Sequence, residues 1–188
     1  MNNSREKAWE LFTQYVDSES LIKHSLAVEA SMIKLAKVFG EDVETWSCCG
    51  LLHDIDFQKY PDQHPVKGPE ILKEAGYSDE FCLAIKGHSD ETNTPRTTKM
   101  AKSLYAIDQL SSFVVACALV RPTKFEGLKV KSVKKKMKDK AFAKAVDRDG
   151  LKKGAEELGI ELSELTQYVI DGLIEREEEL KEINKSLL

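Results

Sequence analysis

The chain has 188 residues, a formal net charge of −4, 41% hydrophobic residues and 32% charged residues, which suits one compact domain or a core with an appended segment. This charge gives no overall reason to expect nucleic-acid binding, and the first residues lack the apolar stretch of a secretory signal. The longest weakly charged run, residues 103–120, contains Asp108 and several polar residues, so we interpret it as a buried helix and not as a membrane span.

Hydrophobic residues recur with helical spacing along the whole chain, and strand-like alternation is nearly absent. The sequence therefore predicts an all-α fold. The periodicity predicts helices over about residues 5–16, 21–39, 43–54, 69–76, 79–88, 99–120, 140–157 and 162–185. At the boundaries we expect a left-handed cap at Gly40, a helix that begins with Pro69 and an N-cap at Ser78.

The composition changes after Pro122, and we divide the chain into a helical core (residues 1–125) and a C-terminal helical extension (residues 126–188). Seven lysines lie between positions 129 and 140. They form either a solvated helix face or a clamp for a nucleotide or polyphosphate. Nucleic-acid binding is less favoured, because no aromatic residues interleave with these lysines. Apolar residues of the last predicted helix recur at nearly heptad spacing, which indicates core packing and, at its far end, a homodimer contact.

Four cysteines lie in apolar surroundings with helical periodicity and form no C-x-x-C motif: Cys48, Cys49, Cys82 and Cys117. We interpret them as small buried thiols and expect a reduced, cytoplasmic compartment.

Imidazole and carboxylate side chains form one series in the sequence: His24, His53, Asp54, His64, His88 and Asp108. All four histidines of the chain belong to it. Neutral imidazole and carboxylate groups are the ligands that a catalytic Mn, Fe, Ni or Zn ion needs. Taken singly, each of the loop histidines His64 and His88 is equally well explained as an ordinary surface residue.

Three positions of the series have informative surroundings. Asp108 is the single charge of the apolar stretch 103–120, and burying an unpaired carboxylate is costly unless a cation compensates it. A carboxylate that reaches solvent or pairs with a lysine is the alternative. His24 lies on the core-facing side of its predicted helix. It is therefore either a hydrogen-bonded core residue or a metal ligand. His53 and Asp54 lie where a buried helix breaks into a loop, which allows both side chains to turn toward one ion.

The segments IKHSLAV, CCGLLHDID, HPVKGPEIL, AIKGHSDE and SLYAIDQL, from about residue 20 to 121, resemble the successive motifs of the HD superfamily of metal-dependent phosphohydrolases. The segments VRPTK and VKSVKKKMKDKAFAK resemble a small, uncharacterised group of predicted hydrolases in that superfamily. The resemblance implies an HD-type helical bundle with a helical extension. It also implies hydrolysis of a small phosphorylated metabolite, with a nucleotide as the first expectation. From the charge and the hydrophobic pattern, we expect neither nucleic acid nor a membrane as a partner.

The resemblance further implies which residues bind metal. The first ion would be held by His24, His53, Asp54 and Asp108. Asp54 would bridge to a second ion held by His64 and His88. A site with a single ion, in which His64 and His88 donate protons to the leaving group, is the alternative.

Two departures from the family pattern limit which residue roles can be assigned to this chain from the resemblance. The common H-D-I-G-K element reads His53-Asp54-Ile55-Asp56-Phe57 here, so the role of its lysine has no counterpart. Where some relatives have consecutive histidines, this chain has a single histidine followed by Ser89. The resemblance therefore gives no support for a third metal ion.

The chemistry implied by the resemblance is attack on phosphorus by a hydroxide that bridges the two metal ions. Asp56 is our candidate for a base or solvent-network residue beside the ligands, and an ordinary loop acid is the alternative. Arg96, Lys67 and Lys59 are the candidates for binding substrate phosphate. Two other functions stay open: a di-iron oxygenase with the same six ligands, and a non-catalytic HD module that binds metal.

Overall fold

The computed structural model describes residues 4–188, and in this range the regular structure is helical, without strands. The all-α prediction is therefore confirmed. The α-helices are α1 (Arg5–Tyr15), α2 (Glu19–Phe39), α3 (Val43–Leu52), α4 (Lys67–Glu74), α5 (Asp79–Lys86), α6 (Lys99–Leu119), α7 (Val130–Met137), α8 (Arg148–Leu158) and α9 (Leu162–Glu182). Two short 3-10 helices are η1 (Pro61–Gln63) and η2 (Asp90–Thr92).

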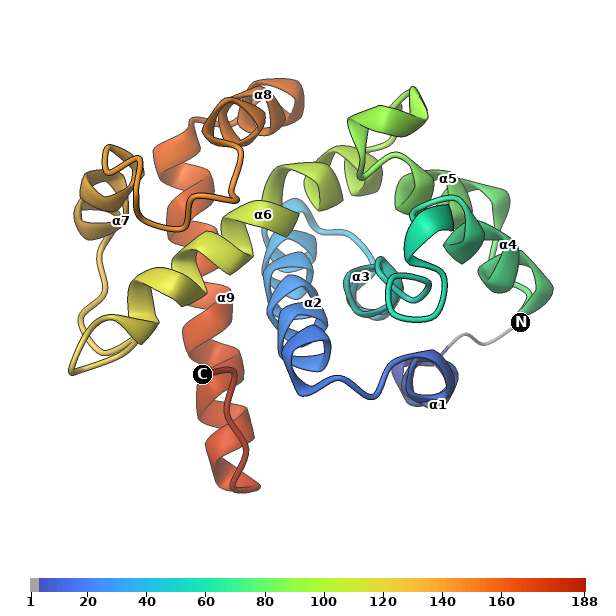
Figure 1. Ribbon diagram of the computed structural model, residues 1–188, viewed down its shortest axis with the longest axis horizontal. Helices are drawn as coiled ribbons and strands as arrows, with labels where there is room; N and C mark the ends of the chain where they lie inside the picture. The colour runs from blue at the N-terminus through green and yellow to red at the C-terminus, as the bar shows by residue number, and fades with distance from the viewer. Residues whose placement is uncertain (1–3) are drawn as a thin grey trace.

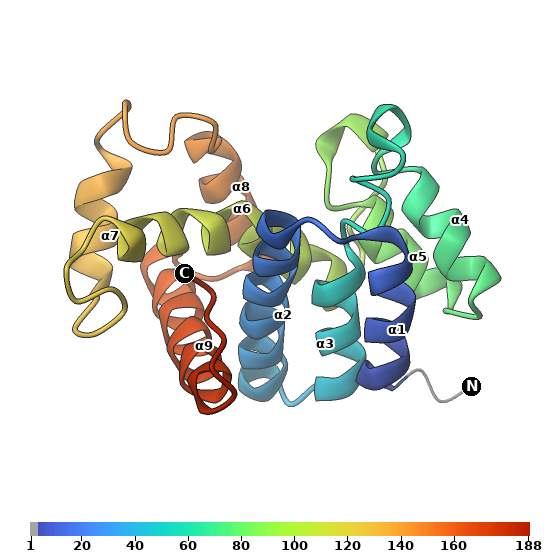
Figure 2. The same ribbon diagram turned by 60° about the horizontal axis from the view of Figure 1, so that its bottom comes forward.

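Four helices lie side by side in one layer, in the order α9, α2, α3, α1 (Figure 2). The long helix α6 crosses this layer over α2 and α9, and α8 packs on the outer side of α6 (Figure 1). Helices α4 and α5 pack against each other, and α5 also contacts α3 and α6. This arrangement brings α2, the end of α3, the end of α5 and the middle of α6 to one place.

The helix crossings are unusually close because glycines lie at the contact points. A Cβ atom on Gly50 of α3 would lie 2.7 Å from the backbone Cα of Glu29 on α2. One on Gly154 of α8 would lie 2.7 Å from the Cα of Ala106, and one on Gly172 of α9 would lie 2.8 Å from the carbonyl oxygen of Ala30. Direct backbone contact therefore sets the spacing of α2–α3, α6–α8 and α2–α9.

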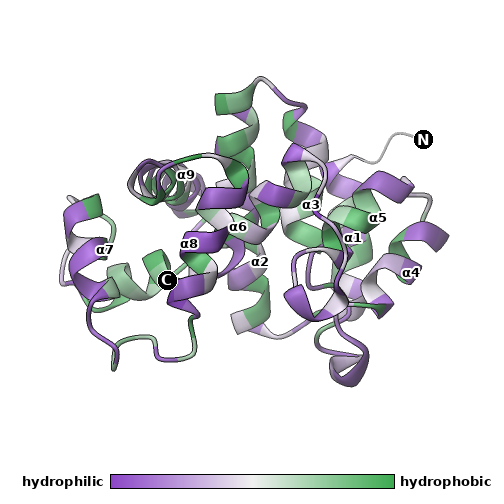
Figure 3. Ribbon diagram, turned by 90° about the horizontal axis from the view of Figure 1, so that it is seen from above, coloured by the Kyte–Doolittle hydropathy of each residue, from purple (hydrophilic) through white to green (hydrophobic). Residues whose placement is uncertain are grey.

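One hydrophobic core runs through the described residues, from Ala8 on α1 to Leu187 beyond α9. Helix α9 belongs to the predicted extension, but it packs beside α2 and contributes Leu165, Val169 and Leu173 to this core. The boundary at residue 125 remains a prediction. Hydrophilic segments are concentrated on the outer helices, such as α7 and α8 (Figure 3).

Several boundary predictions are confirmed. Gly40 has the left-handed φ of 69° after α2, and the side chain of Ser78 accepts a hydrogen bond from the amide of Phe81 at the start of α5. The four cysteine side chains are buried, as expected. Within the described part of the chain, no helix combines the length and the apolar character that crossing a bilayer requires.

Two expectations about helix bounds are wrong. Helix α4 begins at Lys67, so Pro69 is its third residue; the proline is tolerated there because first-turn amides have no partner within the helix. The helix expected over residues 140–157 begins only at Arg148, where Asp147 caps its first turn. The preceding residues form turns instead.

The far end of α9 packs within its own chain, because the segment after Ile183 turns back along the helix. The amide of Leu187 donates to a carboxylate oxygen of Glu177 at 2.8 Å, and the Leu187 side chain is buried. Ile183 itself is exposed. The predicted homodimer contact remains a prediction, with Ile183 as the apolar residue available for it.

Candidate metal centre

Five separate elements present the six residues of the predicted series. His24 lies on α2 and Asp108 lies in the middle of α6. His53 follows the last residue of α3, and Asp54 lies in the turn after it. The remaining two come from the ends of short elements: His64 follows η1, and His88 follows α5.

Each of the four imidazoles has its Nδ1 atom occupied by a hydrogen-bond partner. The Nδ1 of His53 lies 2.8 Å from the carbonyl oxygen of Gly50, and that of His88 lies 2.6 Å from the carbonyl oxygen of Ile85. The other two pairs are His24 Nδ1 with Ser112 Oγ, at 2.9 Å, and His64 Nδ1 with Asp56 Oδ1, at 2.7 Å. An Nδ1–H that donates to an oxygen fixes the tautomer that leaves Nε2 with a lone pair for a metal ion.

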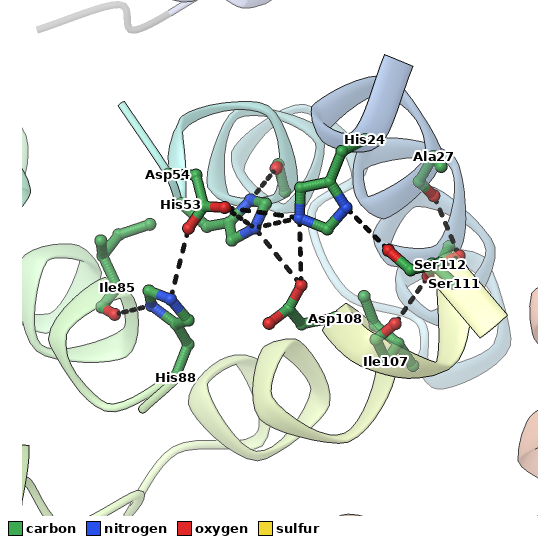
Figure 4. Close-up of polar contacts among 12 residues, drawn as sticks. His24, Ala27, His53, Asp54, Ile85, His88, Ile107, Asp108, Ser111 and Ser112 are labelled. Atoms are coloured by element: carbon green, nitrogen blue, oxygen red, sulfur yellow. Dashed lines mark hydrogen bonds and ion pairs between the residues drawn. The ribbon is translucent and has the colours of Figure 1, made fainter. Parts of the chain in front are cut away.

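The Nε2 atoms of His24 and His53 converge on the two carboxylates of the series (Figure 4). They lie 3.0 Å from each other. Their distances to Oδ2 of Asp54 are 3.4 and 3.3 Å, and their distances to Oδ1 of Asp108 are 3.2 and 3.5 Å. These four residues form the first ligand group.

The second ligand group faces the other oxygen of Asp54. Oδ1 of Asp54 lies 3.6 Å from Nε2 of His64 and 3.4 Å from Nε2 of His88. Asp54 therefore presents one oxygen to each group. This is the arrangement needed for a carboxylate that bridges two ions.

The spacing of the donor atoms fits metal binding. Bonds of about 2.0–2.2 Å from nitrogen or oxygen to a tetrahedral or octahedral ion place neighbouring ligands roughly 3.0–3.6 Å apart. The distances in both groups fall in this range. Two sets of residues each place their ligand atoms close enough together to hold one metal ion. One set is His24, His53 and Asp108, and the other is Asp54, His64 and His88.

The electrostatics of the first group favour positive charge. Burial opposes protonation of His24, but hydrogen bonds with Asp108 and Asp54 outweigh it and raise the pKa of His24 from 6.5 to about 9. The pKa of His53 is also raised well above its usual value: its complete burial is outweighed first by attraction to Asp54. Burial opposes the charge of both carboxylates as well, yet the histidines hold the pKa of Asp54 and of Asp108 well below the usual range. A divalent ion satisfies the same carboxylates and displaces the imidazole protons.

A family model described as HD domain matches residues 21–112 of the chain. Residues 21–112 form an HD domain. The match contains all six residues of the two ligand groups, and the HD superfamily consists in general of metal-dependent hydrolases that bind divalent ions. The resemblance drawn from the sequence motifs is therefore confirmed at the level of the superfamily.

Known proteins are similar to part of the chain. The identity is 35% over 91 residues with ribonuclease Y of Rhodopirellula baltica, covering 45% of this chain and 17% of that protein. It is 36% over 77 residues with an uncharacterized protein of Methanocaldococcus jannaschii, covering 38% of this chain and 46% of that one. It is 33% over 100 residues with ribonuclease Y of Nitratidesulfovibrio vulgaris strain DP4, covering 50% and 18%. The chain thus aligns with less than half the length of each relative, and no solved structure gives a significant match.

Asp56 lies next to the second ligand group of the HD domain, fully buried. One of its oxygens accepts the Nδ1 hydrogen bond of His64, and the other accepts a hydrogen bond of 2.5 Å from the amide of Gly68 at the start of α4. With both oxygens engaged in this way, Asp56 is placed to orient His64. The geometry gives no support for the expected role as a proton-accepting base.

The structure does not bring the three predicted phosphate-binding residues to the centre. The guanidinium of Arg96 is held by Glu157 at 2.7 and 2.8 Å and by Asp90 at 2.9 Å. The ammonium of Lys67 pairs with Glu70, and that of Lys59 donates to the carbonyl oxygen of Gln14. Each of the three cations already has a partner within the chain, and their role in binding phosphate stays a prediction.

A cavity of about 360 Å³ opens on the metal centre. Its walls come from both ligand groups, from the segment after α5, from α6 and from the beginning of α8: His64, His88, Ser89, Asp90, Glu91, Tyr105, Asp108, Gln109, Asp147, Gly150 and Leu151. None of these lining residues is a lysine or an arginine. Charge on a bound phosphate would therefore be neutralised by metal ions and not by basic side chains.

Sequence reasoning missed two contributions to the site. Ser112, which anchors Nδ1 of His24, lies four residues after Asp108 and so on the same face of α6; this helical spacing was a usable signal. The contribution of α8 to the cavity had no such signal, because it depends on how α8 packs on α6.

Proposed function

We propose that the chain is a metal-dependent phosphohydrolase that acts on a small phosphorylated metabolite, with a nucleotide as the first substrate class to test. The observation that carries the proposal is the convergence of four anchored imidazoles on the two oxygens of Asp54, within an HD domain. His24, His53 and Asp108 would hold one ion with Asp54. His64 and His88 would hold a second.

The bound ions would supply a hydroxide nucleophile near neutral pH and would neutralise the phosphoryl oxygens. The residues of the chain keep this centre in position. Partners at Nδ1 orient all four rings, so that little reorganisation is needed when the ions and the substrate bind. The cavity of about 360 Å³ is near the lower end of the range of ligand pockets, roughly 300–1,000 Å³, which favours a small metabolite.

The test is phosphate release by the full chain after loading with Mn, Fe, Ni or Zn. The substrates are a panel of nucleotides and other phosphomonoesters, with p-nitrophenyl phosphate and bis(p-nitrophenyl) phosphate to separate monoesterase from diesterase activity. We expect metal-dependent release that falls by at least about 100-fold in His53→Ala, because this ring has no replacement in the first ligand group.

Two other outcomes would replace the proposal. Consumption of dioxygen by the iron-loaded chain, without phosphate release, would identify a di-iron oxygenase. The absence of metal uptake, together with the absence of phosphate release, would leave a non-catalytic HD module.

A further inference from the structure

The wall of the cavity that the ligands do not form carries carboxylates and no cations. Asp90 and Glu91 come from the segment after α5, and Asp147 comes from the start of α8. We propose that this wall selects a phosphomonoester with a single phosphate on an uncharged, hydroxyl-bearing remainder, and disfavours substrates with a second phosphate. This inference rests on the proposed function and specifies the substrate class of the same site.

The cations closest to the wall are already neutralised. Asp90 pairs with Arg96 at 2.9 Å and with Lys153 at 2.8 Å, and it accepts a hydrogen bond from the hydroxyl of Tyr105. Arg96 also pairs with Glu157 at 2.7 Å. Two acids and two bases therefore balance one another, and neither base contributes to the lining of the cavity.

Glu91 and Asp147 differ from Asp90 in having no close ion-pair partner. Among the residues that the structure describes, neither forms an ion pair closer than 4.0 Å. Asp147 caps the first turn of α8 by accepting a hydrogen bond from the amide of Asp149 at 3.0 Å, which fixes its position without cancelling its charge. A second phosphate in the cavity would face these two negative charges, and no lysine or arginine lines the cavity to offset them.

The same wall suits neutral hydroxyl groups. Carboxylate oxygens accept hydrogen bonds from hydroxyls, and Gln109 adds an amide nitrogen that can donate one. The position of Gln109 is fixed because its side-chain oxygen accepts a hydrogen bond of 2.8 Å from the amide of Asp147. Acceptors and a donor on one wall match a polyol or the ribose of a nucleoside better than a polyphosphate chain.

The experiment compares AMP, ADP and ATP, which share a nucleoside and differ in phosphate number. We expect wild-type kcat/KM to be on the order of 10-fold or more higher for AMP than for ADP, because like charges at close range oppose binding. In the variant Glu91→Gln/Asp147→Asn, the ratio should fall at least about 5-fold. Asn caps helices as well as Asp does, so α8 is expected to keep its first turn.

The control variant, Glu178→Gln/Glu182→Gln, makes the same change in net charge on exposed positions of α9 that do not line the cavity. Its AMP-to-ADP ratio should stay at the wild-type value. Equal use of ADP and AMP by the wild type, or a ratio that shifts equally in both variants, would overturn the inference.

A binding measurement separates this inference from the proposed function. We would titrate the metal-loaded chain calorimetrically with the 5′-methylenephosphonate analogue of AMP and with the α,β-methylene analogue of ADP, neither of which needs to be hydrolysed. We expect the wild type to bind the AMP analogue more tightly than the ADP analogue, and this preference to weaken only in the Glu91→Gln/Asp147→Asn variant. That result would support selection of a single phosphate even if no turnover were found. Equal relative affinities in wild type and variant would refute it, whatever the activity.

Discussion

At the scale of single residues, hydrogen bonds at Nδ1 decide how the histidines of the HD domain can act. Two of the four rings donate to main-chain carbonyls at the ends of their own helices, which are local contacts. The other two use side chains that packing brings close, Ser112 for His24 and Asp56 for His64. The second kind of contact can be altered by one substitution without removing a ligand.

Asp56→Asn tests such a contact. An Asn side chain can accept from only one of the two N–H donors that Asp56 now satisfies, on His64 and Gly68, and its amide group opposes the other. We expect the affinity for the second metal ion to fall by roughly 10–100-fold, with the first ion retained. Metal content after dialysis, at a series of free-metal concentrations, measures both sites. Loss of both ions in parallel would contradict a role confined to His64.

The raised pKa of His24 predicts how metal binding depends on pH. Since the pKa of His24 is raised from 6.5 to about 9, a metal ion must displace a proton from this centre at neutral pH. Affinity should therefore rise as the pH increases from about 6.5 to 9, and binding at pH 7 should release protons. Calorimetry in buffers of different ionisation enthalpy counts these protons. A pH-independent affinity would contradict the prediction.

The same shift has a consequence for the metal-free chain, with the opposite sign. A group whose pKa is higher in the folded state stabilises the fold below its unfolded pKa, and this contribution is lost as the pH rises through the folded value. The contribution of His24 is therefore complete below about 6.5 and lost by about pH 9. Urea unfolding of the metal-free chain should show stability falling over this window, and excess metal should abolish the fall.

At the scale of helices, glycine contacts hold the ligand-bearing elements together. Gly50 on α3 touches the backbone of α2, so the end of α3 that carries His53 lies within reach of His24. Neither helix could approach this closely with a larger residue at position 50. The metal centre thus depends on Gly50 in two ways, because this residue allows the close approach of α2 and α3 and its carbonyl oxygen accepts the Nδ1 hydrogen bond of His53.

Gly50→Ala should destabilise the fold although alanine favours helix formation. The added Cβ would lie 2.7 Å from Cα and 2.8 Å from N of Glu29, and backbone atoms cannot move aside as a flexible side chain would. We expect the free energy of unfolding to fall by about 2 kcal/mol, against a gain of at most roughly 1 kcal/mol in helix propensity. Urea denaturation measures the change; unchanged or increased stability would show that α2 and α3 are not in backbone contact.

At the scale of the whole molecule, a buried carboxylate joins the beginning of the chain to α9. The side chain of Glu29 on α2 is 1% exposed and contacts Arg5 on α1 at 2.8 Å and Arg176 on α9 at 3.3 Å. The hydroxyl of Ser47 on α3 donates to it at 2.6 Å. One carboxylate therefore binds to all three other helices of the α9–α2–α3–α1 layer.

Glu29→Gln would leave two arginines without their shared counter-charge. We expect the free energy of unfolding to fall by about 3 kcal/mol, as for other broken buried ion pairs. The matched control is Glu175→Gln, whose side chain is 44% exposed and pairs with Lys34 and Lys37; it should cost less than about 1 kcal/mol. Equal losses in the two variants, measured by urea denaturation, would contradict a special role for the buried charge.

The sequence by itself determined most of the helices, two of their caps and the chemical identity of the six candidate ligands. These features depend on residues close together in the chain: periodicity, a glycine at position 40, a serine at position 78, and a histidine beside an aspartate at a helix end. Motif resemblance then supplied the grouping of His24 and Asp108 with that pair, although 84 residues separate them (108 − 24).

Only the tertiary structure decided which oxygen of Asp54 faces which histidines, that Asp56 orients His64, and that Arg96 binds Glu157 from α8 instead of facing the cavity. It also decided that α9 lies in the main layer beside α2 and that α8 closes one wall of the cavity. The physical reason is common to these cases. A polar or charged side chain has several possible partners of similar energy, and the packing of distant helices determines which of them is within hydrogen-bonding distance.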